Sequence, residues 1–189
     1  MQKIFDEVNS LDKRCYEEFG LSEDILMEHA ALSMQLYIQE NHSDKKTILI
    51  ACGCGNNGAD GIALARLLHK KFDVTLYFYS KAKSQMAILQ EKRAKALTIP
   101  IIEEVISSDI IVDCIFGTGL NKALDDDAVL LINELNSLDA IKIACDIPSG
   151  ISFDGQVKSV AFDADVTITM GALKTSLFSD VAKDFVGKI

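Results

Sequence analysis

The sequence is poor in the features that mark several classes of protein. Only 2 prolines and no tryptophan occur among 189 residues, and 49% of the residues are hydrophobic, so a disordered tail or linker is not expected. No apolar run has the length of a membrane span, and the first residues, MQKIFDEVNSLDKR, carry acidic side chains where a secretory signal has an apolar core. The composition predicts one globular domain over residues 1–189 that does not enter a membrane.

Positive charge is also scarce. The chain has 19 lysines and arginines against 28 aspartates and glutamates, which gives a formal net charge of −9. A polyanion such as nucleic acid, or an acidic membrane surface, is therefore not an expected partner.

Paired cysteine motifs are missing. The chain has 5 cysteines, and none of them forms a CxxC pair. Reduced cysteines in the core of a cytoplasmic protein explain this pattern better than zinc binding or disulfides. The cysteines are Cys15, Cys52, Cys54, Cys114 and Cys145.

Short apolar runs alternate with segments of helical periodicity along the rest of the chain. This alternation predicts an α/β fold with a mainly parallel sheet. A pair of helices precedes it, over residues 2–19 and from Ser22 onwards, with Gly20 ending the first helix and Ser22 capping the second. The predicted main strands cover residues 47–52, 73–79, 109–116, 141–147 and 164–170.

A glycine-rich turn, GCGNNGADG, follows the first of these strands. We expect a helix to open at Asp60 and end near Lys71, which would place free backbone N–H groups where an anion can bind. The match to the dinucleotide fingerprint GxGxxG is weak, because Ser80 and Lys81 follow the second strand where the fingerprint has an acidic residue. An NADP-linked oxidoreductase stays open as an alternative. No Walker A, GxSxG or HExxH motif is present.

Two carboxylates stand at the ends of otherwise apolar strands. Asp113 and Asp146 each precede a glycine turn, and a buried carboxylate is costly unless it is paired or bound to a cation. Oxygen atoms of Asn57, Asp113 and Ser149 would suit a K⁺, Na⁺ or Mg²⁺ ion. Asp146 would then be free for proton transfer.

Ordered motifs in this chain resemble those of one known family. GCGNNGADGIALARLL, VDCIFGTGL, CDIPSGISFDG and ADVTITMGALK look like the YjeF N-terminal domain, the NAD(P)H-hydrate epimerase family, and LMEHAALSM resembles its LMENAG segment. The resemblance implies a Rossmann-like three-layer fold and usually a homodimer. It implies an isomerase of metabolite repair that interconverts the R and S epimers of hydrated NADH or NADPH, without redox turnover. Family members are often fused to an ATP- or ADP-dependent dehydratase, so functional coupling to such an enzyme is expected.

The resemblance also implies a role for individual residues. Asn57, Asp113 and Ser149 would hold one potassium ion per subunit, and Asp146 would contact the hydrated ring and act as the catalytic acid and base, with Lys122 a weaker candidate for electrostatic assistance. The residues implied to line the substrate site are Asn56, Asn57, Gly58, Ala59, Asp60, Gly117, Thr118, Gly119, Leu120, Asn121, Lys122, Ala123 and Asp146.

Two positions depart from the family pattern. Ala59 replaces a glycine of NNGGD, so the loop must differ or carry strain if that position requires a positive φ. Ala31 replaces the glycine of LMENAG, which puts close helix packing there in question.

Beside the oxidoreductase, a non-catalytic module that binds a nucleotide or a protein is a second alternative to the epimerase, because one fold serves many functions.

Overall fold

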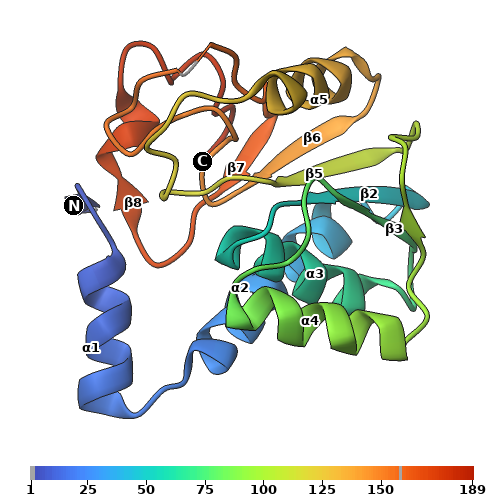
Figure 1. Cartoon of the computed structure of the whole chain (residues 1–189), viewed down its shortest axis with the longest axis horizontal. Coiled ribbons are helices and arrows are strands. Elements are labelled where there is room, and N and C mark those ends of the chain that lie inside the picture. Colours follow the sequence, from blue (N-terminus) through green and yellow to red (C-terminus); the bar gives the residue numbers. More distant parts are fainter. Residues whose placement is uncertain (1–2, 158) are drawn as a thin grey trace.

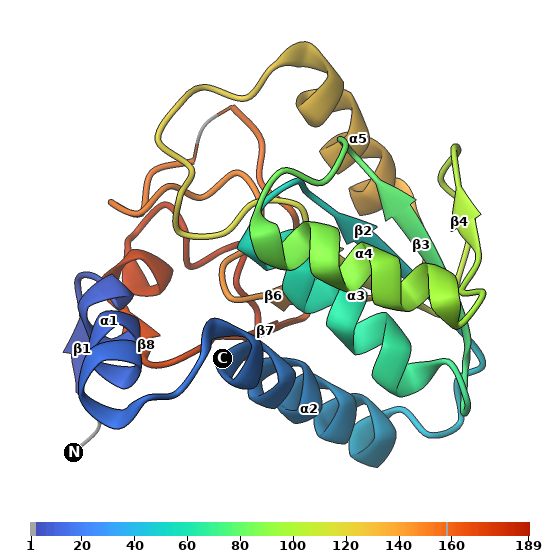
Figure 2. The ribbon, with the colours of Figure 1, turned by 60° about the horizontal axis from the view of Figure 1, so that its bottom comes forward.

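The protein is built around a parallel sheet of six strands. The computed structural model describes residues 3–157 and 159–189. All strand pairs in the sheet are parallel, and the spatial order is β4-β3-β2-β5-β6-β7 (Figures 1 and 2). The α/β prediction is therefore confirmed. The strands are β2 (Thr47–Cys52), β3 (Asp73–Phe78), β4 (Ile101–Ile102), β5 (Ile110–Cys114), β6 (Ile141–Cys145) and β7 (Val166–Ile168).

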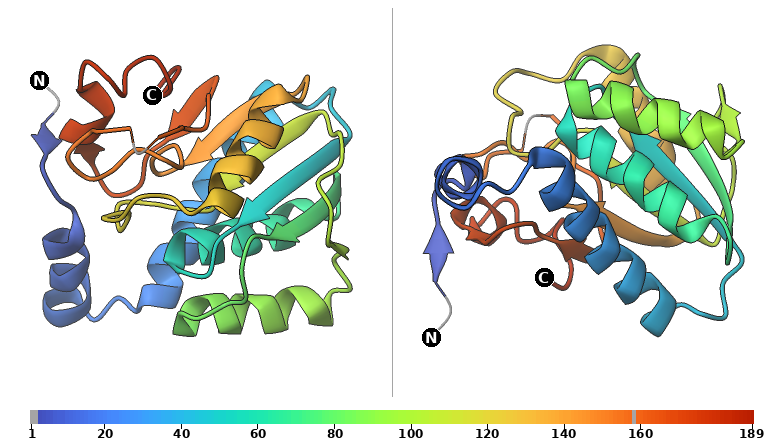
Figure 3. Two further views of the ribbon diagram at one scale, coloured as in Figure 1. Left: turned by 45° about the horizontal axis from the view of Figure 1, so that its top comes forward. Right: turned by 90° about the horizontal axis from the view of Figure 1, so that it is seen from below.

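Helices cover both faces of this sheet and make the three layers. On one face lie α2 (Glu23–Asn41), α3 (Asn56–Leu68) and α4 (Gln85–Ala96), and on the other lies α5 (Asp126–Ser137) (Figures 2 and 3). Successive strand residues point to opposite faces. In β2, Ile48 and Ile50 pack under α3, whereas Leu49 and Ala51 belong to the cluster under α5. No helix in the described part of the chain is long and apolar enough to cross a membrane.

A second, two-stranded sheet stands apart from the main one. In it β1 (Ile4–Phe5) pairs in parallel with β8 (Leu173–Lys174), and α1 (Asn9–Phe19) follows β1 (Figure 2). A 3-10 helix, η1 (Thr175–Phe178), follows β8. The helix predicted over residues 2–19 therefore begins only at Asn9, because the residues before it pair as a strand; residue 2 lies outside the described part.

The helix after the glycine-rich turn also begins at a different residue than predicted. It starts at Asn56, four residues before Asp60, because Gly55 is extended at the N-cap and the chain turns helical directly after it. Two other helix boundaries are confirmed. Gly20 ends α1 in the left-handed conformation with φ 65°, and the Ser22 hydroxyl caps the N-terminus of α2.

The helices on the α3 side pack closely against one another and against the sheet. Ala31 is fully buried in the same core cluster as α3, so the alanine at this position is compatible with close packing. A Cβ atom at Gly61 would lie 2.7 Å from the Cys114 Sγ and 3.0 Å from the Cys52 Sγ. Cys52, Cys114 and Cys145 are buried in the core, as predicted, whereas Cys15 and Cys54 are only partly buried.

Candidate functional site

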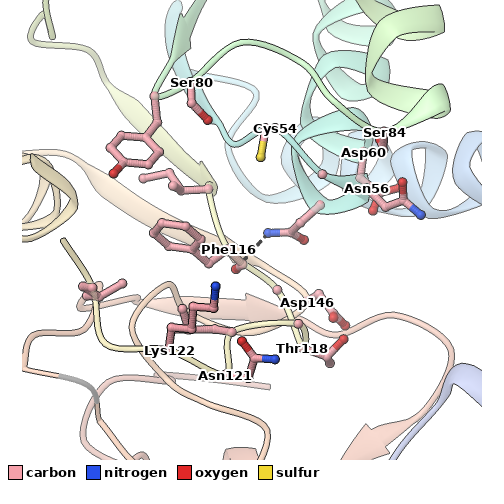
Figure 4. A pocket seen from close by; sticks show the side chains of 18 of the residues that line it. Cys54, Asn56, Asp60, Ser80, Ser84, Phe116, Thr118, Asn121, Lys122 and Asp146 are labelled. Carbon is pink, nitrogen blue, oxygen red and sulfur yellow. Dashed lines mark hydrogen bonds between the residues drawn. The ribbon is translucent and has the colours of Figure 1, made fainter.

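A large cleft opens where the carboxyl ends of the central strands meet. Its volume is about 1270 Å³, larger than the 300–1000 Å³ typical of small-molecule sites, so an extended ligand of dinucleotide size fits its scale. Loops after β2, β3, β5 and β6 form its walls, as Figure 4 shows for side chains of several of these loops. The cleft brings together most of the predicted substrate-site residues, which are Asn56, Asn57, Asp60, Gly117, Thr118, Gly119, Leu120, Asn121, Lys122, Ala123 and Asp146.

Two of the predicted substrate-site residues lie elsewhere. Ala59 is fully buried in the apolar core, and its N–H donates to the Gly55 carbonyl at 3.1 Å. Gly58 is also buried, and a Cβ at that position would lie 2.0 Å from the Gly53 carbonyl oxygen. This corrects the expectation that both residues line the cleft. Ala59 is helical and has no positive φ, so its departure from the family glycine causes no backbone strain.

The N-terminus of α3 faces the cleft, and its first two residues are asparagines that line it. The N-cap residue, Gly55, has no side chain that could cap this end, so the N–H groups of the first turn are available to an anionic ligand. The Asn56 amide donates to the Glu23 carboxylate at 2.6 Å, and the Asn57 amide donates to the Phe116 carbonyl at 3.0 Å, the dashed bond in Figure 4. These two bonds tie α3 to α2 and to the loop after β5, and so fix the cleft wall.

Buried oxygen atoms gather beneath this wall. Asp113 is fully buried, and its Oδ1 accepts from the Ser149 hydroxyl at 2.6 Å while its Oδ2 accepts from the Ser149 N–H at 2.7 Å. The Ser149 hydroxyl oxygen in turn accepts from the Phe116 N–H at 2.9 Å. Burial raises the pKa of the Asp113 carboxyl to about 6, although the hydrogen bonds from Ser149 act in the opposite direction. Asp113 in β5 and Ser149 after β6, two of the predicted ion ligands, are thus in direct contact.

This oxygen set fits a monovalent cation by its chemistry. It offers one carboxylate together with neutral hydroxyl, carbonyl and amide oxygens, all of which are hard ligands. In the described part of the chain, no three His, Cys, Asp or Glu side chains lie close enough together to hold a metal ion. A site with a single carboxylate suits potassium better than it suits a transition metal.

Asp146 occupies a special backbone position at the end of β6. Its φ is 70°, in the left-handed region that few residues other than glycine adopt. The backbone is held there by the N–H of Asp146, which donates to the Ile168 carbonyl at 2.9 Å. The Oδ1 accepts from the Met170 N–H at 3.0 Å. A strained position held by its surroundings is typical of a functional residue, and here it directs a carboxylate into the cleft.

Lys174 completes the surroundings of this carboxylate and received no role from the sequence. Its side chain is 2% exposed, and its Nζ donates to the Asp146 Oδ1 at 2.6 Å. Further donations go to the Met170 carbonyl at 2.7 Å, the Thr169 hydroxyl at 3.0 Å and the Ala172 carbonyl at 3.3 Å. In the sequence, Lys174 is marked only by its place in GALK, shortly after a predicted strand. The strand β8 itself could not be predicted, because two residues are too few to show a periodic pattern.

A family comparison matches most of the chain. The model for the YjeF-related protein N-terminus covers residues 23–176. The chain belongs to this family. The resemblance of the ordered motifs is thereby confirmed.

Relatives of this YjeF N-terminal chain carry two kinds of name. It is 42% identical to the bifunctional NAD(P)H-hydrate repair enzyme Nnr of Helicobacter pylori, over 100% of this chain and 42% of that protein. It is 34% identical to the NAD(P)H-hydrate epimerase of Leuconostoc citreum, over 97% of this chain and 85% of that one. The chain thus spans about two fifths of the bifunctional relatives and most of the epimerases.

A solved structure shares the fold of this YjeF N-terminal chain. The crystal structure of yeast ynu0, YNL200c, superimposes with a TM-score of 0.81 and covers 98% of this chain and 86% of its own, at 17% identity. The three-layer architecture is therefore shared across a wide sequence distance.

Carboxyl groups gather at one end of the cleft. One of them comes from α1, which precedes the residues that the family model matches. At the Asp146 end, burial followed by the charge of Asp146 raises the pKa of Asp60 well above its ordinary value. Asp12 of α1 lines the same cleft, although residues 9–19 precede the matched region 23–176. Sequence reasoning missed Asp12, because neither β1–β8 pairing nor the position of α1 has a local signal.

Proposed function

We propose that this chain is an NAD(P)H-hydrate epimerase that interconverts the R and S epimers of hydrated NADH and NADPH. The observation that carries the proposal is the Asp146 carboxylate, fixed by Lys174 at one end of a cleft of dinucleotide scale. The name of the Leuconostoc citreum relative, which the chain covers over 85% of its length, supports it. The enzyme would be an isomerase of metabolite repair, with no turnover of a redox cofactor.

The epimerisation requires a proton donor and acceptor at the hydrated carbon of the ring. The ring nitrogen can expel the hydroxyl as water once that hydroxyl is protonated, and water can return to either face of the planar ring. Opening to an aldehyde and reclosing is the other route. Asp146 serves either route, because its Oδ1 is anchored by Lys174 and the Met170 N–H while the group faces the cleft.

The remaining walls would hold the rest of the substrate. The free N–H groups at the start of α3 suit the pyrophosphate, as at other helix N-termini. The loop of residues 117–123 faces them across the cleft, and Lys122 adds a positive charge there. These groups bind and orient the substrate so that the hydrated ring lies at Asp146.

A potassium ion would support this wall. Asn57, Asp113 and Ser149 would hold one ion per subunit through their oxygen atoms, which the Phe116 carbonyl adjoins. When bound, the ion supplies a fixed positive charge close to the phosphate-binding end of α3. The buried Asp113 carboxylate is the natural counter-charge for it.

Assembly and location are part of the same proposal. A homodimer is supported by apolar side chains left exposed on the first two helices, among them Phe19 at 65% and Leu36 at 48%. A cytoplasmic location is supported by the free thiols of the cysteines. Functional coupling to an ATP- or ADP-dependent dehydratase is supported by the bifunctional name of the Helicobacter pylori relative.

The decisive experiment supplies the separated R and S hydrates of NADH and NADPH and follows their interconversion by chromatography against a sample without enzyme. The wild-type protein should bring both epimers to the same equilibrium mixture. Asp146→Asn should lose most turnover and still bind the nucleotide, since asparagine tolerates the left-handed backbone. Asp184→Asn, an exposed aspartate outside the cleft, is the control.

Near-normal turnover by Asp146→Asn would refute the assigned role. Reduction of a carbonyl substrate with loss of reduced-nicotinamide absorbance would favour the oxidoreductase instead.

A further inference from the structure

Helix α1 contributes to the cleft although little of it is packed against the rest of the protein. None of its residues is buried, and it stands beside β8 at the edge of the molecule (Figures 1 and 2). The start of the helix nevertheless lines the cleft through Val8, Asn9 and Asp12. A helix with so little core packing owes its position to the few contacts at this end.

Those contacts tie the start of α1 to the segment that carries Lys174. In the β1–β8 pair, Phe5 stands opposite Lys174. The Thr175 hydroxyl donates to the Asp6 carboxylate at 3.1 Å. Val8 is only 9% exposed and packs towards Gly171, in the loop that leads from β7 to β8. The strand that supplies the partner of Asp146 thus also sets the position of α1.

Asp12 stands in the first turn of α1, where a carboxylate suits the helix dipole, but it is not a side-chain cap of the helix. The N-terminus of the helix is already served by Glu7, whose carboxylate accepts from the Ser10 N–H at 3.0 Å. Among the residues that the structure describes, none donates a hydrogen bond to the half-buried Asp12 carboxylate or pairs with it. Burial, and then the charge of Asp146, raise the pKa of Asp12, while the ammonium of Lys174 lowers it. The carboxylate therefore lies within electrostatic reach of the reacting end of the cleft.

This end of the cleft holds three carboxyl groups, and one of them, Asp146, is paired with a lysine. Asp12, Asp60 and Asp146 contribute carboxyl groups, and Lys174 is the cation that contacts one of them. The three N–H donors of Lys174 are fully occupied, because four acceptor oxygen atoms lie within hydrogen-bond distance of its Nζ. A positively charged ligand group beside the Asp12 carboxylate would therefore supply the counter-charge that Asp12 lacks.

We propose that Asp12 is a catalytic residue that contacts the hydrated nicotinamide ring and stabilises positive charge on it. The proposal rests on the epimerase function proposed above. The step starts from the protonated form of Asp146. The C–O bond to the ring hydroxyl breaks, the oxygen leaves as water with the proton of Asp146, which becomes the carboxylate, and the lone pair of the ring nitrogen forms the C=N bond of an iminium cation. Water then adds to either face of that carbon and returns one proton to Asp146. A carboxylate beside the cation lowers the energy of this step.

The test compares Asp12→Asn with Glu17→Gln on the same helix. Glu17 is exposed, lies outside the cleft and pairs with the exposed Lys13, so its replacement removes an equal charge from α1 without touching the site. Epimerisation of the R hydrate of NADH, with a sample lacking enzyme, gives kcat and KM, and thermal melting reports the fold. Asp12→Asn should lower kcat at least tenfold at an unchanged melting temperature. Asp12→Glu should recover part of the loss, and Glu17→Gln should match the wild type.

Each outcome decides between the two proposals. A wild-type protein that does not interconvert the epimers overturns the epimerase function and this inference together. If the wild type is active and Asp12→Asn keeps kcat within twofold, only the role of Asp12 fails, as a ring-opening route without a cation would require. An equal loss in Glu17→Gln, or a melting temperature that falls with kcat in Asp12→Asn, also overturns it, because the effect would then belong to the stability of α1.

Discussion

The Lys174 Nζ lies 2.6 Å from the Asp146 Oδ1, and both side chains are largely withdrawn from water, at 2% and 13% exposure. The two residues reach this contact from different sheets, Asp146 from the end of β6 and Lys174 from β8. The Lys174 ammonium also donates hydrogen bonds to carbonyl and hydroxyl oxygens, which satisfy its remaining N–H groups. The contact therefore fixes the carboxylate and also joins the small sheet to the large one.

Breaking this ion pair should damage both stability and activity. Lys174→Met keeps the length of the side chain but leaves Asp146 without its cation. Loss of one partner of a buried pair typically costs about 3–5 kcal/mol. Urea unfolding should show a loss of that order, and epimerase kcat should fall. Lys183→Met removes an exposed lysine that pairs with Asp180 and should change neither measurement. A Lys174→Met protein as stable and active as the wild type would mean that the pair is dispensable.

Potassium should stabilise the folded protein if Asn57, Asp113 and Ser149 hold it. A ligand that binds only the folded state at about ten times its dissociation constant adds about 1.4 kcal/mol. Melting temperatures in potassium and in choline chloride at equal ionic strength should therefore differ, with potassium higher. Asn57→Ala should abolish the difference, whereas Asn56→Ala, which removes an amide bonded to Glu23, should retain it. Equal melting temperatures of the wild type in both salts would remove the ion from this site.

Exchange of either of the neighbouring residues Gly58 and Ala59 should destabilise the protein, but to very different extents. Ala59→Gly restores the family pattern but puts glycine into the first turn of α3, so it should cost about 1 kcal/mol of stability. Its kcat should not change, because Ala59 faces the core. Gly58→Ala should prevent folding or shift α3, since the added carbon meets the Gly53 carbonyl at 2.0 Å. Urea unfolding and epimerase assays measure both variants, and a Gly58→Ala protein of wild-type stability would contradict the close approach.

Asp109 should stabilise the protein in a pH-dependent way. Its Oδ2 accepts from the Lys46 N–H, the Thr47 N–H and the Thr47 hydroxyl, which joins the start of β5 to that of β2. These bonds lower the pKa of the Asp109 carboxyl. The stabilisation is therefore present above the ordinary aspartate pKa of about 3.9 and is lost as the pH falls through the lower folded value.

The measurement is the melting temperature of Asp109→Asn against pH. The variant should melt below the wild type at neutral pH, and the gap should close in acid. Asp44→Asn, which removes an exposed carboxylate beside Lys45, should show no such gap. A gap for Asp109→Asn that is constant over the whole pH range would show that the charge of the carboxylate plays no part.

Local signals predicted much of the fold. The burial of β2 and β5 on both faces follows from continuous apolar runs, and the caps at Gly20 and Ser22 follow from residue chemistry. The start of α3 was misplaced, because the residues Asn56 and Asn57 favour turns on their own and become helical once Gly58 allows close contact with Gly53.

The sequence by itself determined that Asp113 and Asp146 stand at the carboxyl ends of strands, since strand ends and glycine turns are local features, and the ordered motifs determined the family. Only the tertiary structure decided that Lys174 pairs with Asp146 and that Asp12 faces the same cleft. These contacts depend on the pairing of β1 with β8, whose two residues each are too short to leave a periodic pattern. Such a pairing forms only because residues far apart in the chain are brought together by the completed sheet.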